Sequence, residues 1–436
     1  MIGQLRNLLP LMTGAFFLLV GSTLLSYILQ LALEQNGGSD LAGFGFAAYY
    51  LGFSVGVLRV RPIIESVGHI RTFAAFATLL SSITLIHPLT EQSELLAQPL
   101  WGEAIWVWIW LLMRAVAGLS MAALLIVFDS WVGDGTDPEH RGSVLGVFYT
   151  LFAMGQAAGS LMINLERELS VELYVFASIA ISLSLMPIVL SRRPAPQLLE
   201  YQPLSFRALF RASPTGVVAG AAGGVIVSNL HALIPSLGEQ LGLSTFDNSL
   251  LVVAYIIGGA AAQYPLGRLS DRLDRRLVLI AVGAAGGLIS LATIVLMGVE
   301  GSLPLLIALV CGMGMVAFVQ YPLGIAQLFD RLERNQYIAA ATGIILLYAI
   351  GAVLGTALTG WLMERFGSAV LPLVNGVTLV GLAVFTGIRV MQRDTVPQAE
   401  QEPFIASPAT LLTEVLDPRY ESLESDQSHQ DDGNRH

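Results

Sequence analysis

Residues 104–128 read AIWVWIWLLMRAVAGLSMAALLIVF, an apolar stretch in which the only charged residue is Arg114. An α-helix rises about 1.5 Å per residue, so this stretch is long enough to cross the roughly 30 Å of hydrocarbon in a bilayer. A soluble domain has no need for so long an apolar run. We therefore predict a transmembrane helix here, which indicates that the chain is a membrane protein.

Similar runs recur along almost the whole chain, which predicts an all-α polytopic membrane protein with twelve transmembrane helices. Each run is long enough to span a membrane with some tilt. The predicted spans are 8–33, 41–60, 71–88, 104–128, 143–163, 171–190, 214–235, 248–267, 277–299, 303–325, 338–361 and 369–390.

The distribution of arginine tests this map independently and predicts the topology. With the N-terminus inside, nineteen of the 22 basic residues fall on the cytoplasmic side, whereas Arg167 and Arg365 fall on the other and Arg114 lies within a span. Basic residues concentrate in cytoplasmic loops. We therefore expect a multi-pass protein of the bacterial inner membrane with both termini in the cytoplasm, in contact with the lipid bilayer and monomeric.

Composition excludes several other classes of protein. The chain of 436 residues is 54% hydrophobic and 12% charged, and all of its basic residues are Arg. A P-loop and a Schiff base each need a Lys, so this chain should neither hydrolyse ATP nor form such an adduct. Cys311 has no partner for a disulfide, and the six His show no metal-binding spacing. We expect no enzyme activity, no metal, no cofactor and no nucleic-acid partner.

The hydrophilic stretches divide the chain into two bundles. We predict an N-terminal six-helix bundle at 1–190, a cytoplasmic linker at 191–213, a C-terminal six-helix bundle at 214–390 and a disordered acidic tail at 391–436. An internal repeat supports this division. Tyr49-x-x-Gly52 followed by Glu65 matches Tyr255-x-x-Gly258 followed by Asp271 at a constant offset. Parallel halves of this kind are a known transporter plan.

The clearest motif is 267–276, which reads GRLSDRLDRR after the span at 248–267. It resembles the G-x-L-x-D-R-x-G-R-R loop of the major facilitator superfamily, with Asp274 in place of the second Gly. A second resemblance to that superfamily is Arg114-x-x-x-Gly118-x-x-x-Ala122. Together with the order of spans, these motifs are similar to a bacterial branch of permeases, the YcaD-like proteins. The resemblance implies two pseudo-symmetric six-helix bundles and a transport function, but no substrate.

The loop motif is interpreted as a cytoplasmic gate, because an acid at a helix end can pair with Arg on a neighbouring helix in one state only. The alternative is that these Arg residues only fix the topology. The candidate gate residues come from the motif, from its degraded first-half copy and from the neighbouring helix ends. They are Glu65, Gly68, Arg71, Asp129, Arg141, Gly267, Asp271, Arg272 and Arg275.

Arg114 is the most informative single residue, because a charge deep in a span costs several kcal/mol unless it is paired or hydrated. We expect neutral groups as its partners, with Gln30 and Tyr27 as candidates, and either a role in substrate binding or a structural brace.

Other polar residues in the spans indicate a pathway, although each could instead form an interhelical hydrogen bond. The candidate pathway residues are Tyr27, Gln30, Tyr49, Arg114, Gln156, Asn229, His231, Tyr255, Gln263 and Gln320. For His231, proton transfer is an alternative to a packing role.

Five glycines are predicted to serve close helix packing: Gly118, Gly155, Gly159, Gly351 and Gly355.

The favoured function is secondary transport of a small organic molecule by rocker-switch alternating access, with proton coupling, uptake and efflux left open. The alternative is a transporter-fold receptor or lipid-handling protein without solute flux. A single buried cation with no acid at mid-span argues against a dedicated cation carrier.

Overall fold

The structure is a computed structural model that describes residues 2–91, 105–134, 141–166, 168–190, 204–299, 301–333 and 336–392, together with Gln401 and Phe404. These residues are almost entirely helical and contain no strand. Eleven of their helices are long and apolar enough to cross a membrane. The predicted all-α membrane fold is therefore confirmed. Most of the predicted linker and of the predicted tail lies outside the described residues.

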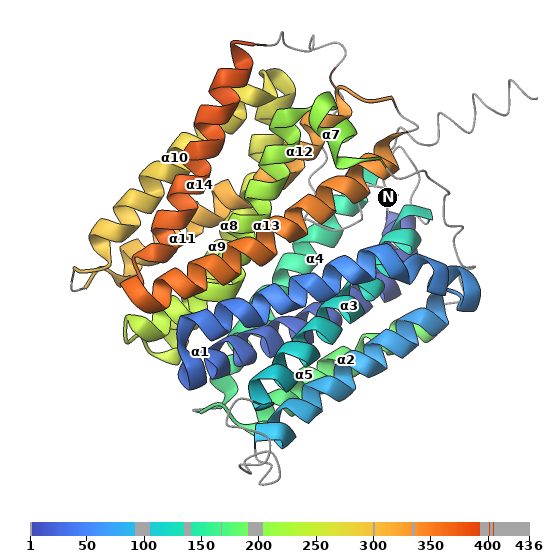
Figure 1. The fold of residues 1–436 in the computed structure, drawn as a ribbon. Helices are drawn as coiled ribbons and strands as arrows, with labels where there is room; N and C mark the ends of the chain where they lie inside the picture. Colours follow the sequence, from blue (N-terminus) through green and yellow to red (C-terminus); the bar gives the residue numbers. More distant parts are fainter. Residues whose placement is uncertain are drawn as a thin grey trace, which may run out of the picture.

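The helices before and after residue 200 form two groups, here called the first half and the second half (Figure 1). The first half contains α1 (Ile2–Val67), α2 (His69–Glu91), α3 (Ile105–Asp134), α4 (Arg141–Leu161), the short 3-10 helix η3 (Met162–Leu165), α5 (Val171–Leu183) and α6 (Leu185–Val189). The second half contains α7 (Phe206–Ala212), α8 (Pro214–Gln240), α9 (Thr245–Arg272), α10 (Arg275–Leu296), α11 (Leu303–Ala317), α12 (Gln320–Phe329), α13 (Tyr337–Phe366) and α14 (Val370–Val390).

Helix α1 combines the first two predicted spans. At 66 residues it would be about 100 Å long if straight, three times the hydrocarbon thickness. The backbone bends at Gly38, whose φ of 75° is in the left-handed region that glycine adopts without strain. The predicted connection at 34–40 is thus a single sharp bend between two arms, 2–37 and 39–67. The two arms correspond to the first two predicted spans.

Two of the other spans are broken where proline removes a hydrogen-bond donor. Pro322 cannot donate to the carbonyl of Phe318 four residues earlier, and helix α11 ends at Ala317 while α12 begins at Gln320. Pro187 has the same relation to Leu183, the last residue of α5. Both breaks divide a predicted span into two shorter helices without changing its course across the membrane.

A close crossing of backbones fixes the second arm of α1 against α3. A Cβ on Gly52 would collide with the carbonyl of Ala115, and a Cβ on Gly118 would collide with the carbonyl of Tyr49. Small residues allow this approach in membrane helices. The Gly118 motif therefore packs against the Tyr49-x-x-Gly52 motif, as the predicted packing role of Gly118 requires.

The same crossing recurs in the second half, between α9 and α11. A Cβ on Gly258 would meet the carbonyl of Cys311, and a Cβ on Gly314 would meet the carbonyl of Tyr255. The repeat detected in the sequence is thus a repeated contact in the structure. At the position that corresponds to Arg114, the second half has the apolar residue Val310.

The remaining predicted packing glycines lie against the first membrane-spanning helix of their own half. Gly155 and Gly159 of α4 face the first arm of α1. A Cβ on Gly155 would lie 2.9 Å from the carbonyl oxygen of Phe16. Gly351 and Gly355 of α13 face α8 in the same way. These four glycines therefore pack helices within a half.

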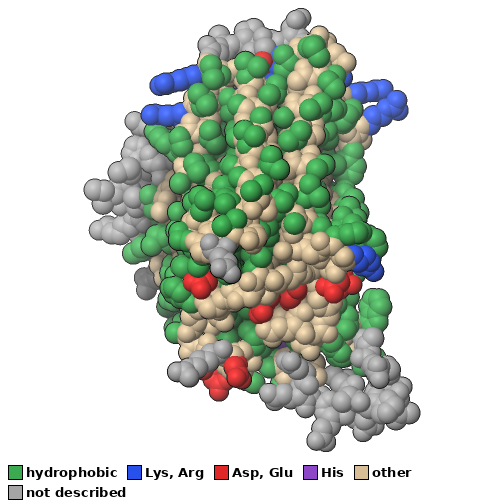
Figure 2. All heavy atoms as spheres, turned by 90° about the vertical axis from the view of Figure 1, so that its left-hand side faces the viewer, with side chains coloured by type: hydrophobic (Ala, Val, Ile, Leu, Met, Phe, Trp, Pro, Cys, Tyr) green, Lys and Arg blue, Asp and Glu red, His purple; other side chains and the backbone are tan. Residues whose placement is uncertain are grey.

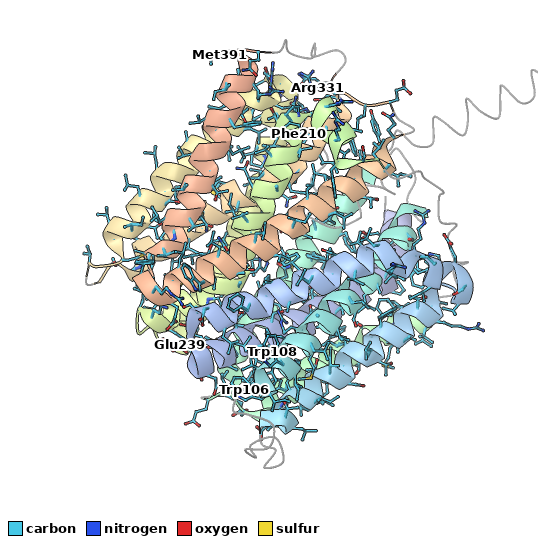
Figure 3. All side chains as sticks on the ribbon, viewed as in Figure 1. Trp106, Trp108, Phe210, Glu239, Arg331 and Met391 are labelled. Carbon is cyan, nitrogen blue, oxygen red and sulfur yellow. The ribbon has the colours of Figure 1, made fainter. Side chains whose placement is uncertain are left out.

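The outer surface carries a broad band of hydrophobic side chains, with most of the basic groups in view near its upper end and acidic groups toward its lower end (Figure 2). We call the end that includes Arg331 and Met391 the arginine-rich end, and the end that includes Trp108 and Glu239 the opposite end (Figure 3). Helix α9 runs from the opposite end at Thr245 to the arginine-rich end at Arg272.

Candidate functional site

A cavity of about 1030 Å³ lies between the two halves. Its lining extends from Pro235 and Val252, in the deeper part, to Gly146 of α4 and Asp271 of α9 at the arginine-rich end. Because residues of both halves line it, the cavity follows from how the two halves pack against each other. It is therefore the natural candidate for a substrate pathway.

Seven of the ten predicted pathway residues line this cavity. They are Tyr27, Tyr49, Arg114, Gln156, His231, Tyr255 and Gln263. They come from α1, α3 and α4 in the first half and from α8 and α9 in the second. Residues separated by more than 200 positions in the chain thus share one wall, as expected for a site between repeats.

Two of the other predicted pathway residues make structural hydrogen bonds outside the cavity lining. The amide nitrogen of Asn229 donates to Thr359 Oγ1 at 3.0 Å and to Asn375 Oδ1 at 2.9 Å, which ties α8 to α13 and α14. Gln320 donates to the Val316 carbonyl at 2.9 Å, across the break between α11 and α12. Both side chains are fully buried, and these hydrogen bonds lie within the second half.

Gln30 also lies outside the cavity lining. With its amide oriented to satisfy its neighbours, the nitrogen donates to the carbonyls of Ala42 at 3.0 Å and Ala232 at 3.3 Å. These carbonyls belong to the second arm of α1 and to α8. Gln30 therefore links the halves and is not a partner of Arg114.

Arg114 lies in the cavity wall and is 1% exposed. Its guanidinium carbon is 5.0 Å from the centre of the Tyr49 ring and 5.6 Å from that of Phe46. Rings at this distance attract a cation through their negative faces. Within the described residues, Nε and Nη2 have no hydrogen-bond partner. Sequence reasoning missed the aromatic partners, because only the Gly52–Gly118 crossing shows that α3 lies beside Tyr49.

Aromatic rings from both halves close the deep part of the cavity. The His231 ring is 6.4 Å from Phe46 across the boundary between the halves, 5.1 Å from Tyr255 and 5.8 Å from Phe318. Its Nδ1 is 2.9 Å from the Val227 carbonyl of the preceding turn. A second link between the halves joins Tyr50 and Tyr348, with ring centres 6.0 Å apart. Apart from Tyr49, Tyr255 and His231, the predicted pathway did not include these rings.

The opposite end is closed by polar contacts between the halves that the sequence did not predict. Glu364 of α13 accepts a hydrogen bond from the backbone N–H of Ser39 at 2.9 Å, where the second arm of α1 begins. Gln240 of α8 donates to Ser39 Oγ at 2.6 Å, and Gln35 donates to Glu239 at 3.1 Å. We call this set the closing network.

Two further contacts complete the closure. Asn164 of η3 donates to Ser249 Oγ of α9 at 2.9 Å. Gly43 and Gly360 place α1 directly against α13, since a Cβ on Gly360 would lie 3.0 Å from the Gly43 Cα and would collide with the Ser39 carbonyl. The cavity therefore opens toward the arginine-rich end and is closed at the opposite end.

At the arginine-rich end, the motif at 267–276 forms a connected cluster within the second half. The buried Arg275 donates through Nε to Asp330 at 2.9 Å and lies 3.6 Å from Asp271. Asp274 accepts from the backbone N–H of Arg276 at 3.0 Å and pairs with its guanidinium at 2.9 Å. Asp274 thus begins α10 as its N-cap, which explains why an acid can replace the expected Gly.

The first-half gate candidates are arranged more loosely. Glu65 is exposed and lies 3.5 Å from Arg61, one turn earlier on α1. Gly68, with φ of 88°, forms the turn into α2, and Arg71 is exposed, as is Arg272 in the second half. Asp129 is buried in α3. The side chain of Arg141 lies outside the described residues. The gate role of these residues remains a proposal.

Asp330→Asn is expected to lower the free energy of unfolding by on the order of 3 kcal/mol, because it removes the main anion beside the buried Arg275. Asp271→Asn is the matched control. The Asp271 side chain is 37% exposed, and its loss should cost no more than about 0.5 kcal/mol. Thermal unfolding of the purified variants in detergent would compare them. Equal losses in the two variants would contradict the assignment of Asp330 as the main partner.

Phe404, from the predicted tail, lies at the mouth of the cavity. Its backbone N–H donates to Asp271 Oδ1 at 2.8 Å, and its ring packs where a Cβ on Gly267 would be. Phe404 is half-buried and belongs to the cavity lining. The two candidate gate residues Gly267 and Asp271 thus contact a residue more than 130 positions away.

Phe404→Ala is expected to make the cavity more accessible from the arginine-rich end, because the ring that narrows the mouth is removed. In a Cys311→Ala background, a cysteine at Gln156 should then react severalfold faster with a membrane-impermeant thiol reagent. Phe366→Ala is the matched control, since Phe366 is 72% exposed at the opposite end. If both variants leave the reaction rate unchanged, Phe404 does not obstruct the mouth.

Within the described residues, no group of three or more His, Cys, Asp or Glu side chains could hold a metal ion.

Comparison with known proteins places the chain among transporters. The family model described as Major Facilitator Superfamily matches residues 11–228 and 216–421. Relatives described as uncharacterized MFS-type transporter YcaD, from Escherichia coli and from Shigella sonnei, are each 25% identical over 374 residues, which is 84% of this chain and 91% of the relative.

Solved structures share the fold. A bacterial homologue of the iron transporter ferroportin in its inward-facing state matches with a TM-score of 0.67 at 13% identity, over 89% of this chain and 99% of that one. Its outward-facing state matches with a TM-score of 0.60 at 14% identity, over 89% and 100%. The Escherichia coli fucose:proton symporter matches with a TM-score of 0.55 at 15% identity, over 88% and 99%.

Proposed function

Because the chain belongs to the Major Facilitator Superfamily, we propose that it is a secondary active transporter that moves a small organic molecule by rocker-switch alternating access. One observation carries this proposal. The cavity between the halves opens at the arginine-rich end, and contacts between α1, α8 and α13 close it at the opposite end. A receptor that moves no solute would not need an end that is closed by polar contacts between the two halves, since such contacts serve to separate and form again.

The closing network is suited to alternation, because its contacts are hydrogen bonds between halves rather than apolar packing. Each is worth only about 1–3 kcal/mol, and since these contacts join the two halves, the set can part without disrupting either half. Opening there and closing at the arginine-rich end would expose the same cavity to the other side of the membrane. We propose that the protein does this as a monomer.

We propose that the arginine-rich end faces the cytoplasm of a bacterium, since basic residues gather on that side of membrane proteins. A reporter enzyme that is active only in the periplasm, fused after Arg393, is then expected to be inactive. The same reporter inserted after Gly242, in the turn between α8 and α9, should be active. Activity of the fusion after Arg393 would reverse the proposed orientation.

His231 is the candidate for proton coupling, because it is the one His among the described residues that line the cavity. Flux should then depend on an imposed pH gradient in the wild type and lose that dependence in His231→Gln. If the gradient dependence is unchanged in the variant, His231 does not couple transport to protons.

The transport proposal is tested with purified protein in sealed liposomes. Cysteines replace Asn164 and Ser249, whose side chains are 2.9 Å apart in the closed end, in a Cys311→Ala background. A panel of organic solutes is first screened for thermal stabilisation, and stabilising solutes are then measured for counterflow. We expect counterflow that stops when a short thiol cross-linker joins the two cysteines.

The outcomes separate the alternatives. Counterflow that continues after complete cross-linking would contradict alternating access through this closure. A solute that stabilises the protein but never crosses the membrane would favour the receptor or lipid-handling alternative.

A further inference from the structure

The deep part of the cavity has an unusual charge balance. Of the charged residues in its lining, Arg268 and Asp271 lie at the mouth, where α9 reaches the arginine-rich end, and Arg114 alone lies deep. The guanidinium of Arg268 lies over the Tyr264 ring, with its carbon 4.8 Å from the ring centre. Asp271 forms an ion pair with Arg275. The described lining contains no acid at the depth of Arg114.

Arg114 has its charge stabilised only in part. The rings of Phe46 and Tyr49 attract the cation, but they accept no strong hydrogen bonds. Nε and Nη2 are both without a hydrogen-bond partner among the described residues, in a side chain that is 99% buried. Unsatisfied charged donors in a buried site are costly. A carboxylate is the group that satisfies adjacent guanidinium N–H groups with two parallel hydrogen bonds.

The rest of the lining is mostly apolar and aromatic, and both halves contribute to it. In the second half, His231, Tyr255 and Phe318 form a connected set of rings. Tyr321 and Tyr348, whose ring centres are 5.6 Å apart, also line the cavity. Such walls bind the flat or aliphatic body of a ligand, while a few polar groups orient it. Val310 stands where Arg114 would repeat, so at this depth of the described lining only the first half offers a charged contact.

We propose that the transported class is amphipathic organic acids with a single negative charge, and this rests on the transport function proposed above. The carboxylate binds Arg114 of the first half, and the aromatic or aliphatic body lies against the rings of the second half. A cation would be repelled by Arg114 and would find no acid. A dianion would leave its second charge uncompensated in a water-poor site.

The test is equilibrium binding to the purified wild-type protein, measured by thermal stabilisation and by titration. The probes share one ring and differ in charge: phenylacetate, phenylacetamide, phenethylamine and phenylmalonate. Octanoate is a monoanion with an aliphatic body. The two monoanions should bind on the order of thirtyfold more tightly than the amide, the lower end for a buried charge pair, and the amine and the dianion should bind more weakly still.

Arg114→Gln should abolish the preference for phenylacetate over phenylacetamide. Arg365→Gln is the matched control, because Arg365 also stacks on a ring, that of Trp361 at 4.1 Å, but lies at the exposed opposite end. If Arg114→Gln does not fold, the charge series on the wild type and on Arg114→Lys decides the matter. Lys keeps the charge but loses the two-pronged contact, so the monoanions should bind more weakly to it without losing their rank.

Three results would overturn the proposal: equal binding of the amide or amine and phenylacetate, no binding of either monoanion, or a monoanion preference that survives in Arg114→Gln. These outcomes are separate from the test of transport. Binding of monoanions without counterflow would leave this inference standing and contradict the transport function. Counterflow of another class of solute would do the reverse.

Discussion

Arg114→Ala is expected to reduce transport at least about thirtyfold while the protein still inserts into the membrane. Loss of one partner of a buried charged contact costs about 2–5 kcal/mol, and every 1.4 kcal/mol is tenfold. Insertion should persist, because removing a charge from the span at α3 makes it more apolar. Counterflow and the amount of protein in purified membranes would be measured together.

Arg114→Gln separates two roles of this residue. Gln can donate hydrogen bonds but cannot neutralise an anion. If Arg114 only braces α3 against the second arm of α1, the Gln variant should transport with normal substrate affinity. If it binds an anionic group, transport should stay impaired. Arg365→Gln controls for the loss of one stacked Arg elsewhere on the protein. Normal transport by both Arg114 variants would remove this residue from the mechanism.

Gly360→Leu is expected to shift the protein away from the state that is closed at the opposite end. The new side chain would meet the backbone of Ser39 and of Gly43, neither of which can move aside without separating α1 from α13. The halves should therefore part at this end, and the network around Glu364 should open with them. The change should act on the balance of states and not on the folding of either half.

The shift would be measured by cross-linking the cysteine pair at Asn164 and Ser249, and the ratio of closed to open protein derived from the yield should fall about tenfold. A penalty of about 1.4 kcal/mol suffices for that, and overpacking commonly costs 1–3 kcal/mol. Gly381→Leu is the matched control, because nothing lies within 4 Å of a Cβ at that position of α14. An unchanged yield in Gly360→Leu would show that the crossing of Gly43 and Gly360 does not hold the end closed.

The candidate site was predictable from the sequence in its type of residue and only partly in its geometry. A charge or an amide within an apolar span is conspicuous, so Arg114, Gln156 and His231 were found. Asn229 and Gln320 are as conspicuous but serve hydrogen bonds inside the second half. A single span does not reveal which way its polar residue points, because hydropathy does not specify rotation about the helix axis.

The closing network shows a different limit. Gln35, Ser39 and Gln240 lie at the ends of apolar runs, where polar residues are ordinary. Their contacts depend on α8 and α13 of the second half ending at the same level as the bend in α1. That level depends on the crossing at Gly43 and Gly360. Similarly, Asp330 looked like an ordinary residue at a helix end until the structure placed it against Arg275.

What the sequence determined by itself is the class of fold and its division into repeated halves, because apolar length, arginine placement and glycine spacing act locally and need no partner to be recognised. The tertiary structure alone decided which polar groups face the cavity, which rings surround Arg114 and which end is closed. These features depend on the rotation and register of helices that are far apart in the chain. Close glycine crossings fix both the rotation and the register of two helices, because the backbones can approach this closely only where both present small residues.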